Sequence, residues 1–208
     1  MRAIALAPIR NTPGKKDATG AFQPELHRFR DFLLNFPKSD GERVQIPCYM
    51  ELLDEKDKIT VISEYGKKNY KEDLNIIAIF SHGLPGAIKI CGKKFIDFKN
   101  YKDFVKVVFE NADKKEPIYI GLYACLTGKN LAHAIAIEMS WYPVRFRLIA
   151  HTTAGHTTYN PYVIRFTERD LAGSFICQPG SPEWKGWRRR LREDKDLRFR
   201  ILFEDVVK

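Results

Sequence analysis

Two apolar segments decide the fold, and each ends in a residue that is able to do chemistry. Residues 76–83 read Ile-Ile-Ala-Ile-Phe-Ser-His-Gly, and residues 118–125 read Ile-Tyr-Ile-Gly-Leu-Tyr-Ala-Cys. Nearly continuous apolar runs of this length are typical of strands buried on both faces of a sheet. The first strand ends at His82 and the second at Cys125. These strand ends are therefore where the sequence directs a search for function.

Amphipathic segments alternate with these runs along the chain. Residues 87–96 predict a hairpin that turns at Gly92, and apolar residues at helical spacing predict helices within 98–108 and 131–139. Residues 144–150 and 162–166 predict further strands. This alternation is the pattern of a mainly parallel central sheet with helices on both faces, an α/β fold. Ligands of such sheets bind outside the carboxyl ends of the strands.

The N-terminal part of the chain predicts a strand, a loop, a helix and another strand. Residues 1–10 favour a first strand over a signal peptide, because the apolar stretch is short and a basic residue ends it. Residues 11–23 are rich in Gly, Pro, Lys and Thr and predict a loop. A helix is expected to begin near Pro24 and to stop at Pro37. Residues 58–65 predict a strand.

Size, composition and charge narrow the class of protein. The chain has 208 residues, of which 44% are hydrophobic and 29% charged, as in ordinary globular proteins. We expect one domain over residues 1–208, with a basic segment at about 181–208, and no membrane-spanning segment. Lys and Arg total 35 against 26 acids, a net charge of +9. That excess favours an anionic partner, although many basic proteins have none.

The cysteine and histidine patterns argue against a metal or another cofactor. The four cysteines are Cys48, Cys91, Cys125 and Cys177, and none has C-x-x-C spacing. Four scattered cysteines fit a reducing compartment, so a cytoplasmic location is expected. A zinc site made by His82, His151 and His156 is an alternative, but no acid or cysteine falls at ligand spacing with them. We expect neither metal nor cofactor.

Cysteine and histidine together are the components of a nucleophile and its base. A thiol becomes a strong nucleophile when a neighbouring histidine takes its proton or stabilises its thiolate. Cys125 is the candidate nucleophile and His82 the candidate base. The backbone N–H groups of Gly83 and Cys125 are candidates for an oxyanion hole, since acyl transfer needs donors aimed at the developing charge. Considered alone, a cysteine after an apolar strand is more often a small buried hydrophobe.

The two segments together resemble the double signature of the caspase-like cysteine peptidases. In that family one hydrophobic strand ends in Ser-His-Gly and another in Ala-Cys, at a separation similar to the 43 residues between His82 and Cys125. The hairpin after Gly83 and the Thr-Gly pair that follows Cys125 look most like CHAT-type members. The resemblance covers residues 74–153. It implies a caspase-like three-layer sandwich, with His82 as the base and Cys125 as the nucleophile.

One departure from the family concerns substrate choice. Caspases proper have Gln before Ala-Cys, and Tyr123 stands at that position here. The residue accepted by the site is therefore left open. Candidate substrate-binding residues at the strand ends are Ser81, Tyr123, His151 and Thr152.

The basic segment near residue 190 has two interpretations. Arg188, Arg189 and Arg190 lie among tryptophans, a combination that suits phosphate contact and base stacking. The candidate ligands are nucleic acid and an inositol phosphate, because an inositol phosphate activates the toxin self-cleaving domains of the family. The alternative is an amphipathic surface helix with Trp187 and Leu191 inward and its arginines solvated.

Three functions remain open at this point. The leading hypothesis is a cysteine endopeptidase, including a self-processing one, that acts on a protein or peptide. The alternative is a non-catalytic caspase-like module that binds a polyanion or a protein partner through its basic surface. A hydrolase of non-peptide amides would use the same pair of residues.

Overall fold

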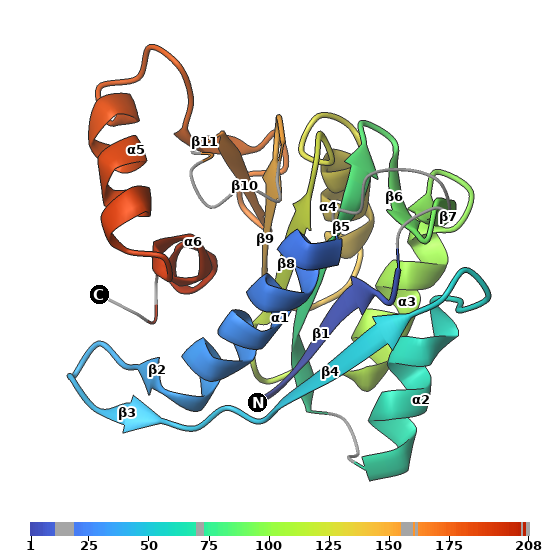
Figure 1. The fold of residues 1–208 in the computed structure, drawn as a ribbon. Helices are drawn as coiled ribbons and strands as arrows, with labels where there is room; N and C mark the ends of the chain where they lie inside the picture. The colour runs from blue at the N-terminus through green and yellow to red at the C-terminus, as the bar shows by residue number, and fades with distance from the viewer. Residues whose placement is uncertain (11–18, 70–72, 155–159, 161, 205, 207–208) are drawn as a thin grey trace.

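A twisted, mostly parallel sheet forms the centre of the molecule (Figure 1). The structure is a computed structural model that describes residues 1–10, 19–69, 73–154, 160, 162–204 and 206. The sheet order is β11-β10-β9-β8-β5-β1-β4. Five strands run parallel: β1 (Arg2–Pro8), β4 (Cys48–Leu53), β5 (Leu74–Leu84), β8 (Ile118–Ala124) and β9 (Phe146–His151). Two antiparallel strands extend the sheet beyond β9: β10 (Val163–Thr167) and β11 (Ser174–Cys177).

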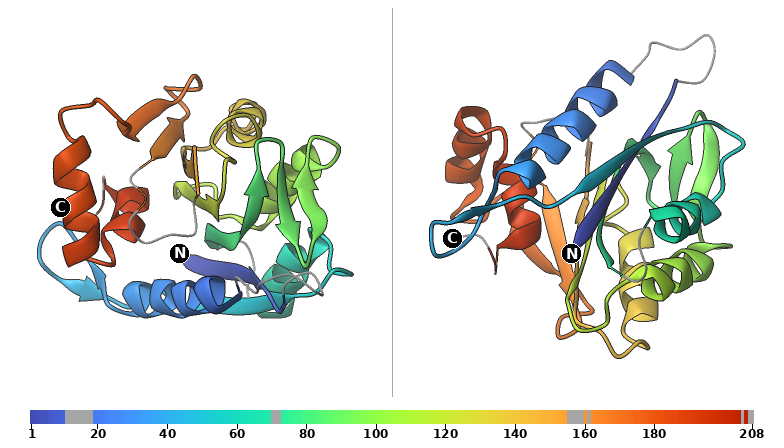
Figure 2. Two further views of the ribbon diagram at one scale, coloured as in Figure 1. Left: turned by 45° about the horizontal axis from the view of Figure 1, so that its top comes forward. Right: turned by 90° about the horizontal axis from the view of Figure 1, so that it is seen from below.

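Helices cover both faces of this sheet, so the predicted α/β three-layer arrangement is confirmed. Figure 2 shows α1 and α6 on one side and α2, α3 and α4 on the other. The helices are α1 (Thr19–Leu34), α2 (Thr60–Asn69), α3 (Tyr101–Asn111), α4 (Leu131–Met139), α5 (Trp184–Glu193) and α6 (Leu197–Arg200), followed by the 3-10 turn η1 (Ile201–Phe203). The structure contains no helix, among the described residues, that is long and apolar enough to cross a membrane.

The alternation of side chains along the strands separates two different cores. In β5, Ile77 and Ile79 point to one side, whereas Ile76, Ala78 and Phe80 point to the other. We call the first side the aliphatic face; its sheet residues are Ile4, Leu6, Ile77, Ile79, Ile118, Ile120, Leu122 and Leu148. We call the second the aromatic face; its rings are Phe22, Phe29, Phe32, Phe36, Phe80, Tyr119, Tyr123, Phe199 and Phe203.

Two small antiparallel elements complete the fold. The predicted hairpin is present as β6 (Ala87–Ile90) and β7 (Lys93–Asp97), with Cys91 and Gly92 both at positive φ, at 45° and 83°. Positive φ at both loop residues is the geometry that matches the twist of a two-residue hairpin. The hairpin extends from β5, because β6 pairs with the end of β5 at His82, Gly83 and Leu84. The other element pairs β2 (Phe36–Pro37) with β3 (Arg43–Val44).

Several boundaries differ from the prediction. Residues 58–65 were expected to be a strand, and this is wrong: they lead into α2, where Val61 and Ile62 are buried against the aliphatic face. Short β-branched runs fit either periodicity, and here packing on α3 decides for the helix. The loop expected at 11–23 is helical from Thr19, with Pro24 inside α1, while 11–18 lie outside the described residues. Strands β4 and β11 were not predicted.

Candidate active site

The end of β8 lies beside β5, which continues for three further residues to Leu84. The two strands are adjacent and parallel, and the last pair in their register joins Ser81 to Ala124. His82 and Cys125 are the next residue of each chain segment. Neighbouring strands lie about 4.8 Å apart, so the register alone places the backbones of this pair close together.

The same register shows which way the two side chains leave the sheet. Phe80 and Tyr123 are partners across the two strands, and their rings stack on the aromatic face with centroids 4.7 Å apart and planes 6° from parallel. His82 and Cys125 lie two residues further along each segment. Because side chains in a strand alternate with a period of two, His82 of β5 falls on the same face as the stacked rings, and Cys125 begins the turn that follows β8.

Gly83 packs directly against the backbone of Cys125. A β-carbon at position 83 would lie 2.8 Å from the Cys125 nitrogen and closer still to the Cys125 carbonyl oxygen. No other residue type fits such a close approach of two backbones without a shift of one of them. The two segments proposed from the sequence to carry an oxyanion hole are therefore in direct contact.

The turn after Cys125 is fixed by hydrogen bonds to its neighbours. Leu126 has a positive φ of 62°, and its N–H donates to the Thr153 carbonyl at 2.8 Å. The buried Thr127 hydroxyl donates to the Ala124 carbonyl at 2.9 Å. Gly128 N–H donates to the His151 carbonyl at 2.9 Å. These bonds hold the turn against the end of β9, which restricts where the Cys125 side chain can lie.

The imidazole of His82 is supported from α1. The Phe22 ring meets the His82 ring edge to face, with centroids 5.0 Å apart and planes at 88°. Phe22 is itself only 1% exposed, whereas His82 is half-buried. The position of α1 therefore affects the orientation of the candidate base.

Two of the predicted substrate-binding residues, Ser81 and Tyr123, are buried. Ser81 is buried, and its hydroxyl donates to the Lys89 carbonyl. Tyr123 is 1% exposed, its hydroxyl donates to the Arg198 carbonyl at 3.4 Å, and burial raises the pKa of its phenol. We therefore assign both side chains a packing role beneath the site.

The end of β9 contributes the other two candidates. His151 is 2% exposed and packs at 6.3 Å, centroid to centroid, from the Tyr123 ring. Thr152 is half-buried, and its N–H donates to the Tyr162 carbonyl at 3.0 Å. Thr152 is thus the more accessible of the two. His156, the third member of the alternative zinc set, lies outside the described residues.

The other cysteines have environments that oppose ionisation or lie away from these strand ends. Burial raises the pKa of the Cys48 thiol to about 12. Burial also raises the pKa of Cys177, and Glu183 adds to that effect. Cys91 is half-buried in the β6–β7 turn and donates to the Leu53 carbonyl at 3.5 Å. Within the described chain the four cysteines form no disulfide.

One group of potential metal ligands occurs in the part of the chain that the structure describes. Asp54, Glu55 and Cys91 place their ligand atoms within 4.8 Å of one another. The Arg10 guanidinium already contacts both carboxylates, at 3.0 Å and 2.8 Å. These contacts give the two acids an internal cation partner, and neither His82 nor His151 belongs to the group.

The basic C-terminal segment divides into two unlike parts. In α5 the predicted anion-binding residues Arg188, Arg189 and Arg190 are all exposed, while Leu191 is buried. The Arg190 guanidinium lies over the Trp187 ring, 5.0 Å from its centroid. Arg198 in α6 is instead 2% exposed; burial lowers its pKa, and the carboxylate of Glu25 opposes that change.

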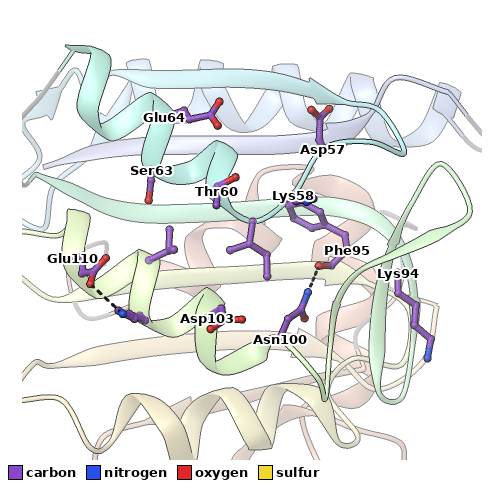
Figure 3. Close-up of a pocket in the computed structure, with 13 residues that line it drawn as sticks. Asp57, Lys58, Thr60, Ser63, Glu64, Lys94, Phe95, Asn100, Asp103 and Glu110 are labelled. Carbon is purple, nitrogen blue, oxygen red and sulfur yellow. Dashed lines mark hydrogen bonds and ion pairs between the residues drawn. The ribbon is translucent and has the colours of Figure 1, made fainter.

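A hollow of about 680 Å³ lies on the outside of the aliphatic face, between α2, α3 and β7 (Figure 3). Figure 3 shows carboxylates and lysines mixed along its wall, with Glu64 and Asp57 on one side and Asp103 and Glu110 on the other. Glu110 pairs with Lys106 at 3.9 Å, one of the interactions drawn. His82 and Cys125 do not line this hollow.

No protein-family model matches the chain, and no curated protein sequence matches it. The function is therefore inferred from the contacts of the molecule itself.

Proposed function

We propose that this protein is a caspase-like cysteine endopeptidase, with Cys125 as the nucleophile and His82 as the base. The observation that carries the proposal is the register of β5 and β8, with the Phe80–Tyr123 stack directly before the pair. The close contact of Gly83 with Cys125 supports an oxyanion hole shared by these two residues. The hydrolysis of non-peptide amides would use the same groups.

The proposed reaction proceeds in two acyl-transfer steps. His82 accepts the Cys125 proton, and the thiolate sulfur attacks the carbonyl carbon of the scissile amide. Backbone N–H groups of Gly83 and Cys125 stabilise the oxyanion. As the C–N bond breaks, imidazolium His82 gives its proton to the leaving amine, which leaves a thioester on Cys125. A water molecule, deprotonated by His82, then hydrolyses the thioester and restores the thiol.

The test combines a nucleophile variant with a base variant. Cys125→Ala should abolish cleavage, and His82→Ala should reduce it severely, because each removes one half of a unit that works together. The double variant should cost little more than either single change. Cleavage is measured on a diverse peptide library and on the chain itself, by mass spectrometry.

Cys91→Ala is the matched control, since Cys91 is also half-buried but lies in the β6–β7 turn. It should retain wild-type cleavage. Activity that survives Cys125→Ala and disappears with Cys91→Ala would assign the nucleophile elsewhere and overturn the proposal. We infer a reducing compartment such as the cytoplasm, because a catalytic thiol must stay reduced.

A second function is favoured by α5, which exposes five basic side chains along its 10 residues. These are Lys185, Arg188, Arg189, Arg190 and Arg192. We propose that this helix can bind a polyanion, such as a nucleic acid or an inositol phosphate, with or without catalysis. Binding of single-stranded nucleic acid should weaken steeply as salt rises, because counterions are released. Absence of binding at low salt would return these arginines to a solvated surface.

A further inference from the structure

Arg198 is a charged residue in the most aromatic part of the core. It belongs to α6 and is 2% exposed. Its guanidinium lies 5.2 Å from the centroid of the Tyr123 ring, 5.3 Å from that of Phe199 and 6.0 Å from that of Phe80. An ionised group is costly to bury unless a partner compensates its charge. The residues around Arg198 therefore need an explanation.

The compensating partner comes from the other end of the sequence. Glu25 of α1 forms an ion pair with Arg198, with Glu25 Oε2 2.8 Å from Arg198 Nη2, and the Glu25 side chain is only 10% exposed. The second oxygen of Glu25 lies 3.4 Å from Arg28, which in turn lies 3.2 Å from Asp196 at the start of α6. Four charged side chains thus connect α1 to α6, which lie on the same side of the sheet (Figure 2).

This connection ends at the candidate base. Glu25 lies one helical turn after Phe22, whose ring supports His82 at 5.0 Å. On the other side, Arg198 lies over Tyr123, the residue two positions before Cys125. The buried arginine therefore lies directly against Tyr123, two residues before Cys125, and is linked to His82 through Glu25 and Phe22 of α1.

Stability alone does not account for an arginine here. Replacing a buried ion pair by apolar residues of similar volume is often neutral or even stabilising. Moreover, none of the Arg198 nitrogens Nε, Nη1 and Nη2 makes a hydrogen bond to the described residues, so the contact with Glu25 is an ion pair alone. What an ion pair adds beyond apolar packing is a defined geometry, because its partners have one preferred arrangement.

We propose that Arg198 is a positioning residue for the Cys125–His82 pair. It fixes α1 through Glu25, so that Phe22 holds the His82 ring in line with Cys125. This inference rests on the proposed function and names the group that orders its site. A misplacement of about 1 Å in a catalytic pair can cost about 100-fold in rate, so loss of this anchor should be visible at the thiol.

The test uses a variant that keeps the core filled and removes only the charges, Glu25→Leu with Arg198→Met. The readout is the rate of Cys125 alkylation by iodoacetamide from pH 5 to 9, resolved by mass spectrometry. In the wild type, His82 should support the thiolate well below pH 8. In the variant the midpoint of the rise in alkylation rate should move toward that of an ordinary thiol, near pH 8.5. The alkylation rate at pH 6.5 should fall about tenfold. Thermal unfolding should show the variant folded at the assay temperature.

Two further variants complete the design. Arg200→Met is the matched control: it removes the next arginine of α6, which pairs with Asp194 on the surface side, and it should keep the wild-type profile. Glu25→Gln keeps the shape of the side chain and should give the same shift as the double variant. Thermal unfolding must show that Glu25→Gln is folded as well, because it leaves the buried Arg198 without an anionic partner.

The outcomes separate this inference from the proposed function. A folded Glu25→Gln or double variant with the wild-type alkylation profile would show that Arg198 has a packing role only. If instead the wild type itself shows an ordinary thiol profile that His82→Ala does not change, the proposed function fails, and this inference with it. That second result comes from the wild type and His82→Ala alone, so it does not depend on any Arg198 variant.

Discussion

The two faces of the sheet are packed by different chemistry. The aliphatic face contains mainly Ile, Leu and Ala side chains from the strands, together with Phe146 and Phe166, and is covered by α2, α3 and α4. The aromatic face contains stacked rings, the buried Glu25–Arg198 pair and, by strand alternation, His82, with Cys125 in the turn at the end of β8. Aliphatic side chains of similar volume can replace one another at modest cost, whereas rings and charges require specific partners. The side chains that depend on specific partners are therefore concentrated on the aromatic face.

The largest expected effect tests whether the aromatic face depends on its charges. Arg198→Met alone leaves Glu25 without its nearest cation and should lower the free energy of unfolding by about 3–5 kcal/mol. On the aliphatic face, Ile79→Val, equally buried, should cost only about 0.5–1.5 kcal/mol. Urea unfolding measures both. Adding Glu25→Leu to Arg198→Met should recover much of the lost free energy of unfolding. A double variant less stable than Arg198→Met would contradict the view that the aromatic face depends on this charge pair.

The next effect concerns the two strand ends. Gly83→Ala places a methyl group against the Cys125 backbone and should destabilise the protein by about 1–3 kcal/mol while abolishing cleavage. Gly186→Ala is the matched control, because no atom lies within 4 Å of the added methyl and the position is within α5. It should stabilise by up to about 1 kcal/mol. Equal stabilities for the two variants would show that Gly83 is not tightly packed.

A third prediction concerns alkaline pH. Burial raises the pKa of Cys48 to about 12 from an ordinary value of 9.0, and burial also raises that of Tyr123; both pack on the aromatic face. The unfolded thiol ionises first, so it binds fewer protons than the native thiol and stability falls as pH rises above 9. The Cys48 contribution is about 1 kcal/mol at pH 10. Urea titrations at pH 8 and 10 should show a smaller fall in the free energy of unfolding for Cys48→Ala than for the wild type. The same fall in both proteins would contradict the prediction.

The smallest effect belongs to the charges outside both faces. Changing Arg188, Arg189 and Arg190 to Gln should alter the free energy of unfolding by no more than about 0.5 kcal/mol, because all three are exposed. The same change should flatten the salt dependence of binding to single-stranded nucleic acid. If the triple change lowered the free energy of unfolding as much as Arg198→Met does, the predicted difference between buried and exposed arginines would be wrong.

The sequence predicted the elements whose apolar patterns are clearest. Strands β5 and β8, the β6–β7 hairpin and the helices α3 and α4 were all expected, because each has an uninterrupted apolar run or a clear helical face. Strand β4 was missed because most of its residues are only half-buried, which weakens any alternation. Residues 58–65 were misread because β-branched residues fit both periods over a short window.

The candidate site was predicted in part, for a physical reason. His82 and Cys125 were found because each comes at the end of a clear apolar run, although His82 still lies within β5, which extends to Leu84. Nothing in the local pattern distinguishes Arg198 from Arg188, since both lie in the same basic run. Their difference arises from a contact with Glu25, 173 residues earlier in the chain. Long-range partners of this kind are set by the tertiary fold and leave no signal at the charged residue itself.

The position of α6 on the aromatic face also affects how the chain matures during synthesis. Residues 197–203 close the face beneath His82 and Cys125, yet they are made about 70 residues after Cys125. At about 5–20 residues per second, the ribosome needs on the order of ten seconds to supply them. During that interval the stacked rings have no cover from α6, and Glu25 has no Arg198. A nascent chain therefore holds Cys125 beside an uncovered aromatic face until residues 197–203 have been made, and under the proposed function cleavage would begin only after that point.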